Sequence, residues 1–171
     1  MRLLSLTAAL FLMLVPILAA AEDFTIEAEG LTALPMFVDT AIRSSKGFES
    51  DACKLIGKSV NLSDQGAKTG FIVTTANACA WGAAQGPIWV VRVVADSAEL
   101  VLHYVGYSVT IGQSKKHGLR HLAISAGTAT RYSYSLWKFD GATYQRTQNY
   151  MFTPEDKELC KSHPKICPWE M

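Results

Sequence analysis

The chain lacks an excess of charge of either sign and any long run of basic residues. Its 171 residues include 16 lysines and arginines against 15 aspartates and glutamates. Removing Arg2 with the leader described below leaves 15 of each, so the remaining chain is formally neutral. A neutral chain without basic runs is a poor partner for nucleic acid or anionic lipid. Its aromatic residues are also not interleaved with basic ones, as single-strand binding would require. We therefore expect no nucleic-acid partner.

Long hydrophobic runs are missing except at the N-terminus. A short basic start, Met1-Arg2, leads into LTAALFLMLVPILA, which is shorter than the roughly 20 residues of a membrane span. Ala19-Ala20-Ala21 then gives a small-x-small pattern before Glu22. We predict a signal peptide over residues 1–21, with a retained membrane anchor as the alternative. No cysteine stands at the cleavage point, so we expect a single unanchored domain, residues 22–171, in the periplasm or secreted.

Four cysteines follow this leader: Cys53, Cys79, Cys160 and Cys167. An even count in an oxidising compartment predicts two disulfides, which can pair in three ways. Cys160 and Cys167 enclose only KSHPKI, whose proline turns the chain, so we favour Cys160–Cys167 together with Cys53–Cys79. The first of these pairs would pin the C-terminal tail.

The alternative for the tail is a zinc site made by Cys160, His163 and Cys167. Structural zinc sites use four ligands, normally in closely spaced pairs. The sequence shows no obvious fourth ligand, and an oxidising compartment favours the disulfide. We therefore expect no metal and no other cofactor.

Helical periodicity is confined to one segment, residues 31–46, LTALPMFVDTAIRSSK. Met36, Phe37, Ala41 and Ile42 recur near helical spacing, and Pro35 suits a first turn. The rest of the chain is rich in β-branched and aromatic runs separated by Gly, Asn, Asp and Ser. These runs predict strands near 60–62, 70–75, 88–94, 100–104, 108–111, 121–125, 132–139 and 143–147.

Two of the predicted strands are especially clear. SYSLWKF, residues 133–139, alternates along its length, and Asp140-Gly141 follows it as a tight turn. PIWVVRVV, residues 87–94, is almost continuously apolar, as a strand covered on both faces requires. We predict an α+β fold, mainly β, in which an N-terminal helix is followed by an antiparallel meander of blade-like β-sheet.

A weak internal repeat supports the blade-like sheet. DQGAKTGFIVTT from Asp64 and KKHGLRHLAIS from Lys115 align at an offset of 52 residues, close to the length of a propeller blade. With CAWG, PIWVV and LWKFDGATYQ, these pieces span residues 64–146. This part of the chain resembles a loosely defined group of exported bacterial blade-like β domains with integrin-type calcium loops. That group includes periplasmic lysozyme inhibitors and immunity proteins, so the resemblance implies a protein-binding function.

The corresponding loops of this chain lack most of the acidic residues that bind calcium in that group. Calcium needs several oxygen ligands, mainly carboxylates. The first loop keeps only Asp64, and the second has Lys115, Lys116 and His117 where acids would stand. We expect Gly118 to serve a turn, with the basic residues solvated; the other interpretation is that they contact an acidic partner surface.

Recognisable reaction chemistry is also missing. There is no G-x-S-x-G elbow. Ser135 and Lys138 match S-x-x-K, but an alternating strand points them to opposite faces. His103 lies in an apolar strand, where a structural role is the usual one. We therefore expect a non-catalytic protein. The alternative is a periplasmic enzyme or small-ligand binder whose site, around His103, Glu99 or Asp140, forms only in the fold.

Two loops are candidates for partner binding. Residues 78–87, ACAWGAAQGP, carry one large aromatic, Trp81, which can act as a binding anchor or fold back to fill the core. Residues 125–132, SAGTATRY, end in Arg131 and Tyr132, and can also be an ordinary hairpin linker. Together with Lys115 and Lys116, these residues predict a surface that occludes a protein partner, such as a lysozyme-like cell-wall hydrolase or a toxin.

Overall fold

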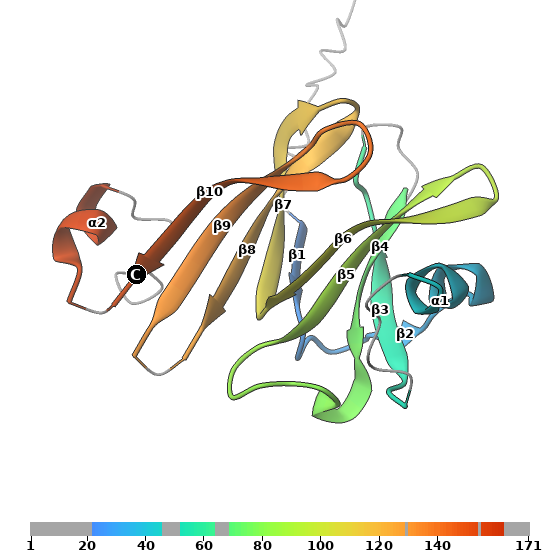
Figure 1. Ribbon diagram of the computed structural model, residues 1–171, viewed down its shortest axis with the longest axis horizontal. Helices are drawn as coiled ribbons and strands as arrows, with labels where there is room; N and C mark the ends of the chain where they lie inside the picture. The colour runs from blue at the N-terminus through green and yellow to red at the C-terminus, as the bar shows by residue number, and fades with distance from the viewer. Residues whose placement is uncertain (1–21, 46–51, 64–68, 129, 154, 163–171) are drawn as a thin grey trace, which may run out of the picture.

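Figure 1 shows the computed structural model, which describes residues 22–45, 52–63, 69–128, 130–153 and 155–162. The predicted signal peptide and cleavage site precede this range, and Asp64, His163 and Cys167 also lie outside the described residues. The described chain forms two antiparallel five-stranded sheets.

The first sheet, here the helix-side sheet, has the strand order β2-β3-β4-β5-β6. The eight-residue helix α1, Met36–Arg43, packs on its outer face. The strands of this sheet are β2 (Thr32–Ala33), β3 (Leu55–Val60), β4 (Gly70–Thr75), β5 (Gly86–Val94) and β6 (Ser97–Gly106).

The second sheet, here the tail-side sheet, has the order β1-β7-β8-β9-β10. Its last four strands form a meander, and β1 is added at the free edge of β7. The short helix α2, Lys157–Ser162, follows this sheet. The strands are β1 (Glu22–Thr25), β7 (Ser108–Lys116), β8 (Leu119–Gly127), β9 (Tyr132–Phe139) and β10 (Tyr144–Phe152).

The main core lies between the two sheets. Alternate side chains of the facing strands are buried there, as the period of two along a strand requires. The helix-side sheet contributes Val60, Leu62, Ile72, Ile88, Val90, Val101 and Leu102, and the tail-side sheet contributes Phe24, Val109, Ile111, Leu119, Leu122, Ile124, Trp137, Phe139 and Tyr144.

The chain crosses from one sheet to the other through a single residue, Tyr107 (Figure 1). Its backbone N–H donates to the carbonyl of Ser125 in β8 at 2.7 Å. Beside it, Gly106 lies so close to β8 that an added Cβ would be 2.6 Å from Cγ2 of Ile124. Only glycine allows the sheets to approach this closely at the crossing.

A second core lies on the outer face of the helix-side sheet. Val38 and Ile42 of α1 are fully buried against Leu55, Val73, Trp89 and Val91. Arg43 holds the end of the helix, because its Nε donates to the Asp39 carboxylate at 2.7 Å and its Nη2 donates to the carbonyl of Cys53 at 3.0 Å. The helix is thus joined to the segment that carries the disulfide.

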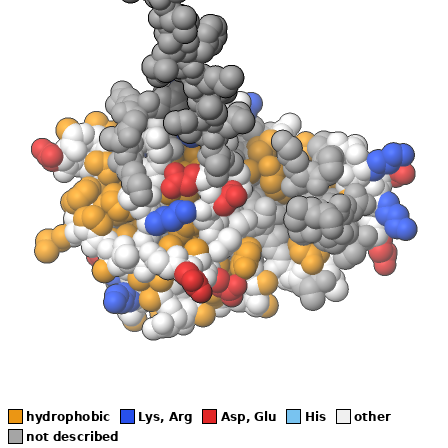
Figure 2. Space-filling view, turned by 180° about the vertical axis from the view of Figure 1, so that it is seen from behind, with side chains coloured by type: hydrophobic (Ala, Val, Ile, Leu, Met, Phe, Trp, Pro, Cys, Tyr) orange, Lys and Arg blue, Asp and Glu red, His pale blue; other side chains and the backbone are white. Residues whose placement is uncertain are grey.

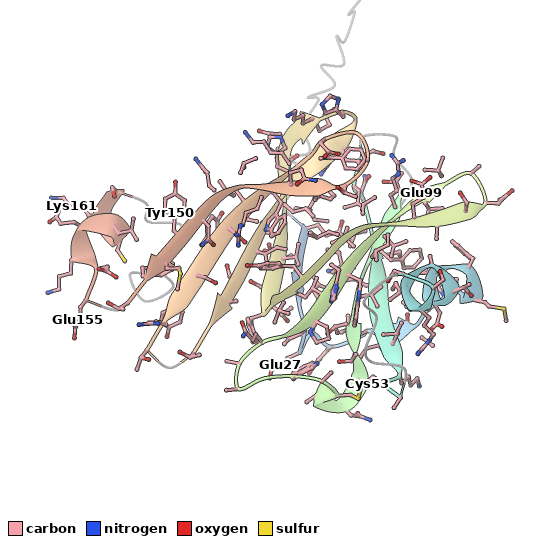
Figure 3. All side chains as sticks on the ribbon, in the orientation of Figure 1. Glu27, Cys53, Glu99, Tyr150, Glu155 and Lys161 are labelled. Carbon is pink, nitrogen blue, oxygen red and sulfur yellow. A yellow bond between two sulfur atoms is a disulfide. The ribbon has the colours of Figure 1, made fainter. Side chains whose placement is uncertain are left out.

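The predicted disulfide between Cys53 and Cys79 is confirmed. It joins the segment before β3 to the loop after β4, and Figure 3 labels Cys53 at this edge. A disulfide indicates an oxidising, non-cytoplasmic compartment. The predicted Cys160–Cys167 pair stays a prediction, because Cys167 lies outside the described residues. No helix within the described ranges is long and apolar enough to cross a bilayer.

The α+β prediction is wrong. The described chain is mainly β, with two sheets in place of one meander, and the predicted N-terminal helix over 31–46 is not the opening element. Strands β1 and β2 come first, and the helix is limited to Met36–Arg43. Pro35 explains the shorter helix, because proline disfavours helical geometry in the residue before it, and Thr32–Ala33 pair instead with β3.

The crossing at Gly106 provides a test of the packing. We expect Gly106→Ala to lower the free energy of unfolding by about 1–3 kcal/mol, because the new methyl overlaps Ile124 in a filled core. Gly112→Ala in β7 is the matched control, since its Cβ would meet nothing closer than 3.4 Å. Chemical denaturation of both variants measures the difference, and equal effects would contradict the close approach.

Candidate functional site

The β7–β8 hairpin presents an exposed group of basic residues. Lys115, Lys116 and His117 are all exposed at its tip. Lys116 pairs with Leu119 across the turn, so the loop is only His117-Gly118, and both residues have positive φ, 47° and 84°. Two-residue hairpin turns of the primed type need this geometry. The predicted turn at Gly118 is confirmed, and it holds the lysines on a short, well-defined hairpin.

His121 and Lys138 extend this positive region onto the neighbouring strands. Burial lowers the pKa of His121, and the charges of Lys138 and then Lys116 lower it further. The charges of Lys138 on β9 and Lys116 on β7 thus both act on the imidazole of His121. We call Lys115, Lys116, His117, His121 and Lys138 the basic end. Figure 2 shows acidic and basic side chains interspersed on the described part of the opposite face.

Trp81 does not stand out from its loop as a free anchor. It is half-buried against the main core, and its Nε1 donates to Oγ1 of Thr75 at 2.9 Å. The Thr75 hydroxyl in turn donates to the carbonyl of Cys79. The indole ring also covers Gly86, where an added Cβ would lie 2.8 Å from the ring. These contacts give Trp81 a role in closing the disulfide-bearing loop.

Arg131 and Tyr132 lie in the connection between β8 and β9. Arg131 is exposed, and the backbone N–H of Thr128 donates to its carbonyl at 2.7 Å. Tyr132 is half-buried and stacks on Phe152 with ring centroids 5.8 Å apart. Phe152 and Cys160 are buried in a small cluster with Tyr134, Tyr150 and Leu159, and Figure 3 labels Tyr150 beside α2. Tyr132 therefore helps attach α2 to the tail-side sheet.

The predicted binding residues do not form one surface. Strand β8 begins beside the basic hairpin and ends at the connection that carries Arg131. Its nine residues separate the two by about 27 Å at 3.4 Å per residue. Figure 1 shows the β7–β8 turn and the β8–β9 connection at opposite ends of the sheet. Trp81 belongs to the helix-side sheet, on the connection from β4 to β5.

The residues considered for catalysis are also kept apart. His103 stacks on Trp89 at 5.2 Å on the outer face of β6, and burial lowers its pKa. Glu99 lies on the same strand but pairs with Arg92 at 2.5 Å, and Arg92 lies over Phe139 of the main core. Asp140 accepts two backbone N–H groups in the β9–β10 loop, which lower its pKa. These three side chains do not form one site.

Ser135 and Lys138 point to opposite sides of β9. Ser135 is buried and accepts a hydrogen bond from Nε1 of Trp137 at 2.8 Å, whereas Lys138 acts on His121 at the basic end. Among the described residues, no group of three or more His, Cys, Asp or Glu side chains is arranged to hold a metal ion. The zinc alternative involves residues outside the described ranges.

One cluster was not predicted from the sequence. Tyr104 of β6, Trp137 of β9 and Arg146 of β10 meet at the edge of the sandwich, and we call them the edge cluster. Tyr104 and Trp137 make an edge-to-face contact at 4.8 Å, and Arg146 donates from Nη1 to the Tyr104 hydroxyl at 3.1 Å. The alternation in residues 133–139 puts Trp137 on one face of its strand. Its partners Tyr104 and Arg146 come from other strands, so the pattern does not predict this contact.

In comparisons with known proteins, no family model, curated protein or solved structure matches the chain.

The position of Trp81 leads to a stability prediction. We expect Trp81→Ala to lower the free energy of unfolding by about 2–4 kcal/mol, somewhat below the loss for a fully buried tryptophan. Trp81→Phe keeps most of the packing but removes the donor to Thr75, so we expect about 1 kcal/mol. Denaturation of the two variants separates packing from the hydrogen bond. An unchanged midpoint for Trp81→Ala would restore the interpretation of Trp81 as a free anchor.

The basic end leads to a prediction about His121. Its pKa in the folded state lies below the unfolded value of about 6.5, so the unfolded chain binds more protons between these two values. The stability contributed by neutral His121 is therefore present above pH 6.5 and lost as pH falls toward the folded pKa. We expect Lys138→Gln or Lys116→Gln to raise the pKa of His121, measured by an NMR titration of the imidazole.

Lys157→Gln on α2 is the control for that titration, because it removes one charge from another part of the protein. We expect it to leave the pKa of His121 unchanged. If neither Lys116→Gln nor Lys138→Gln moves the titration, the two lysines do not act together at this end.

Proposed function

We propose that the chain is an exported, non-catalytic binding protein of the periplasm or the extracellular space that docks its basic end on an acidic surface of a partner protein. The single observation that supports this most is the exposure of Lys115, Lys116 and His117 together at the tip of a two-residue hairpin turn. In an otherwise neutral chain, like charges held together repel one another and so weaken the fold. Their usual benefit is complementarity to a surface of opposite sign.

The geometry of the hairpin supports docking. A two-residue turn and the cross-strand pairs Lys115–Arg120 and Lys116–Leu119 fix its backbone. A surface that is ordered before binding loses less conformational entropy on association. The hairpin therefore offers a preformed contact, and the disulfide and the two packed sheets supply its support.

A cell-wall hydrolase is the partner class that we favour. Glycoside hydrolases generally carry two carboxyl groups across their cleft, so the cleft attracts a basic hairpin of suitable width. Occlusion of such a cleft agrees with the resemblance to exported blade-like domains that include lysozyme inhibitors and immunity proteins. A toxin with an acidic active-site cleft would be bound by the same surface.

The test compares charge variants in one binding assay. The wild-type chain is immobilised and exposed to envelope proteins beside Lys115→Gln/Lys116→Gln, with Lys157→Gln/Lys161→Gln on α2 as the control of equal charge change. We expect a partner retained by wild type and control, at least tenfold less by the hairpin variant, and less at high salt for all three. The purified partner is then assayed for cell-wall hydrolysis with and without the chain.

Two results would contradict the proposal. Equal retention by all three proteins would remove the basic end from the interface. A retained hydrolase whose activity is unchanged at saturating concentrations of the chain would show binding without occlusion.

A further inference from the structure

The edge cluster combines three side chains from three strands at the open edge of the sandwich. Strands β6 and β10 are edge strands of their respective sheets. Tyr104 is half-buried, Trp137 is buried with 8% of its surface exposed, and Arg146 is exposed. The rings of Tyr104 and Trp137, here called the aromatic floor, therefore lie inside the protein, and the guanidinium of Arg146 lies at the boundary with solvent.

Arg146 faces this floor because it follows the core residue Tyr144 by two positions on β10, and alternate residues of a strand share a face. The pairing between β9 and β10 shifts between Arg146 and Gln148, so that Thr147 is the extra residue and its hydroxyl donates to the carbonyl of Leu136 at 3.2 Å. Arg146 pairs with Trp137, and its side chain lies on the same side of the sheet.

The floor itself is fixed by hydrogen bonds. Nε1 of Trp137 donates to Oγ of Ser135 at 2.8 Å, and that hydroxyl donates to the carbonyl of Ile124 at 3.2 Å. Tyr104 packs edge-to-face on the indole at 4.8 Å. Since the ring cannot turn without breaking these contacts, it gives Arg146 a rigid support.

Arg146 is held on two sides. Its guanidinium carbon lies 6.0 Å from the centre of the Trp137 ring, and its Nη1 donates to the Tyr104 hydroxyl at 3.1 Å. A guanidinium has five N–H donors in a planar fork. The contact with the indole and the bond at Nη1 both restrict the guanidinium before any ligand arrives, which reduces the entropy lost on binding.

The planar arrangement of the N–H donors on the Arg146 guanidinium determines which class of ligand it binds best. A planar guanidinium matches the two oxygens of a carboxylate with two parallel hydrogen bonds. Sugar stacking does not fit, because Trp137 is 92% buried and presents almost no free ring surface. A phosphate group is normally held by several cations or backbone N–H groups, whereas Arg146 is the one cation in the described contacts of this cluster.

We propose that Arg146, oriented by Trp137 and Tyr104, forms a binding site for a single carboxylate. The site is separate from the basic end, because Arg146 lies on the inner side of β10 and His121 and Lys138 lie on the outer face of the same sheet. It does not rest on the proposed function. The carboxylate can come from an acidic side chain or from a peptide C-terminus, and both offer the same two oxygens.

The test is an NMR titration of the ¹⁵N-labelled chain that follows the Arg146 Nε–H and the Trp137 Nε1–H. The probes are acetyl-Ala-Glu-Ala-amide, its neutral isostere acetyl-Ala-Gln-Ala-amide, acetyl-Ala-Ala-Ala with a free carboxylate, and inorganic phosphate, all at constant ionic strength. We expect one or both carboxylate peptides to shift these two signals in a saturable manner, and the Gln peptide to leave them unchanged. The peptide that binds more tightly identifies the source of the carboxylate.

Arg146→Lys is the decisive variant, because it keeps the charge and removes the planar fork. We expect its affinity for the better peptide to fall about tenfold, as for the loss of a charge-assisted hydrogen bond. Arg131→Lys, at an exposed arginine of the β8–β9 connection, should bind as the wild type does. Spectral dispersion of each variant shows that it remains folded.

Three results would overturn the proposal. The first is undiminished binding by Arg146→Lys, which would mean that charge alone is recognised. The second is tighter binding of phosphate than of either peptide at the same two signals. The third is the absence of any shift at Arg146 and Trp137 with both carboxylate peptides.

Discussion

The close contact between Gly106 and Ile124 sets the relation between the two sheets. At this point the chain leaves β6, passes through Tyr107 and starts β7, so neither sheet can move without the other. The hydrogen bonds of Tyr107 to Ser125 and of Ile26 to Tyr107 secure both sides of the crossing. The main core forms on one side of each sheet as a result. Every surface considered for binding takes its position from this crossing.

The two sheets leave different groups exposed. The helix-side sheet is covered by α1 on its outer face, and the Arg43 contacts join that helix to the segment of the Cys53–Cys79 disulfide. The outer face of the tail-side sheet is polar near His121 and aromatic near Tyr132, where α2 packs. The edge cluster lies where β6 faces β9 and β10. His121 and Lys138 of the basic end therefore lie on the opposite face of the tail-side sheet from the edge cluster.

Local features of the sequence were predicted where the pattern itself determines the structure. The bounds of β4 and β9 agree with the predicted 70–75 and 132–139, because alternation and turn residues mark both ends. Strands β1 and β2 were missed, since four and two residues carry too little periodicity. The helix was drawn too long because the residues before Pro35 are apolar, although proline makes them extended. Asp140-Gly141 was expected to form a tight turn, but Phe139 pairs with Tyr144 and leaves a four-residue loop.

The candidate sites also differ in how far the sequence predicts them. Lys115 and Lys116 are neighbours in sequence, so their charge could be recognised directly. Tyr104 and Arg146 are 42 residues apart, and their contact exists only because β6 of one sheet packs against the inner face of β10 in the other. No local pattern reports the packing of one sheet on another. The sequence around Trp81 is compatible with both an anchor and a core residue, and its packing on the main core, its bond to Thr75 and its cover over Gly86 decide for the structural role.

The two-residue turn at His117-Gly118 also limits how this protein can diversify. An inserted residue would have to change the turn to a longer type or shift the pairing of β7 with β8, and such a shift would reverse the faces of the shifted side chains. Exchange of side chains on an unchanged backbone, such as at Lys115 and Lys116, avoids both changes. The connection between β8 and β9 is longer and exposed, and it can accept insertions at low cost. Related chains that recognise different partners should thus vary in composition at one end of the sheet and in length at the other.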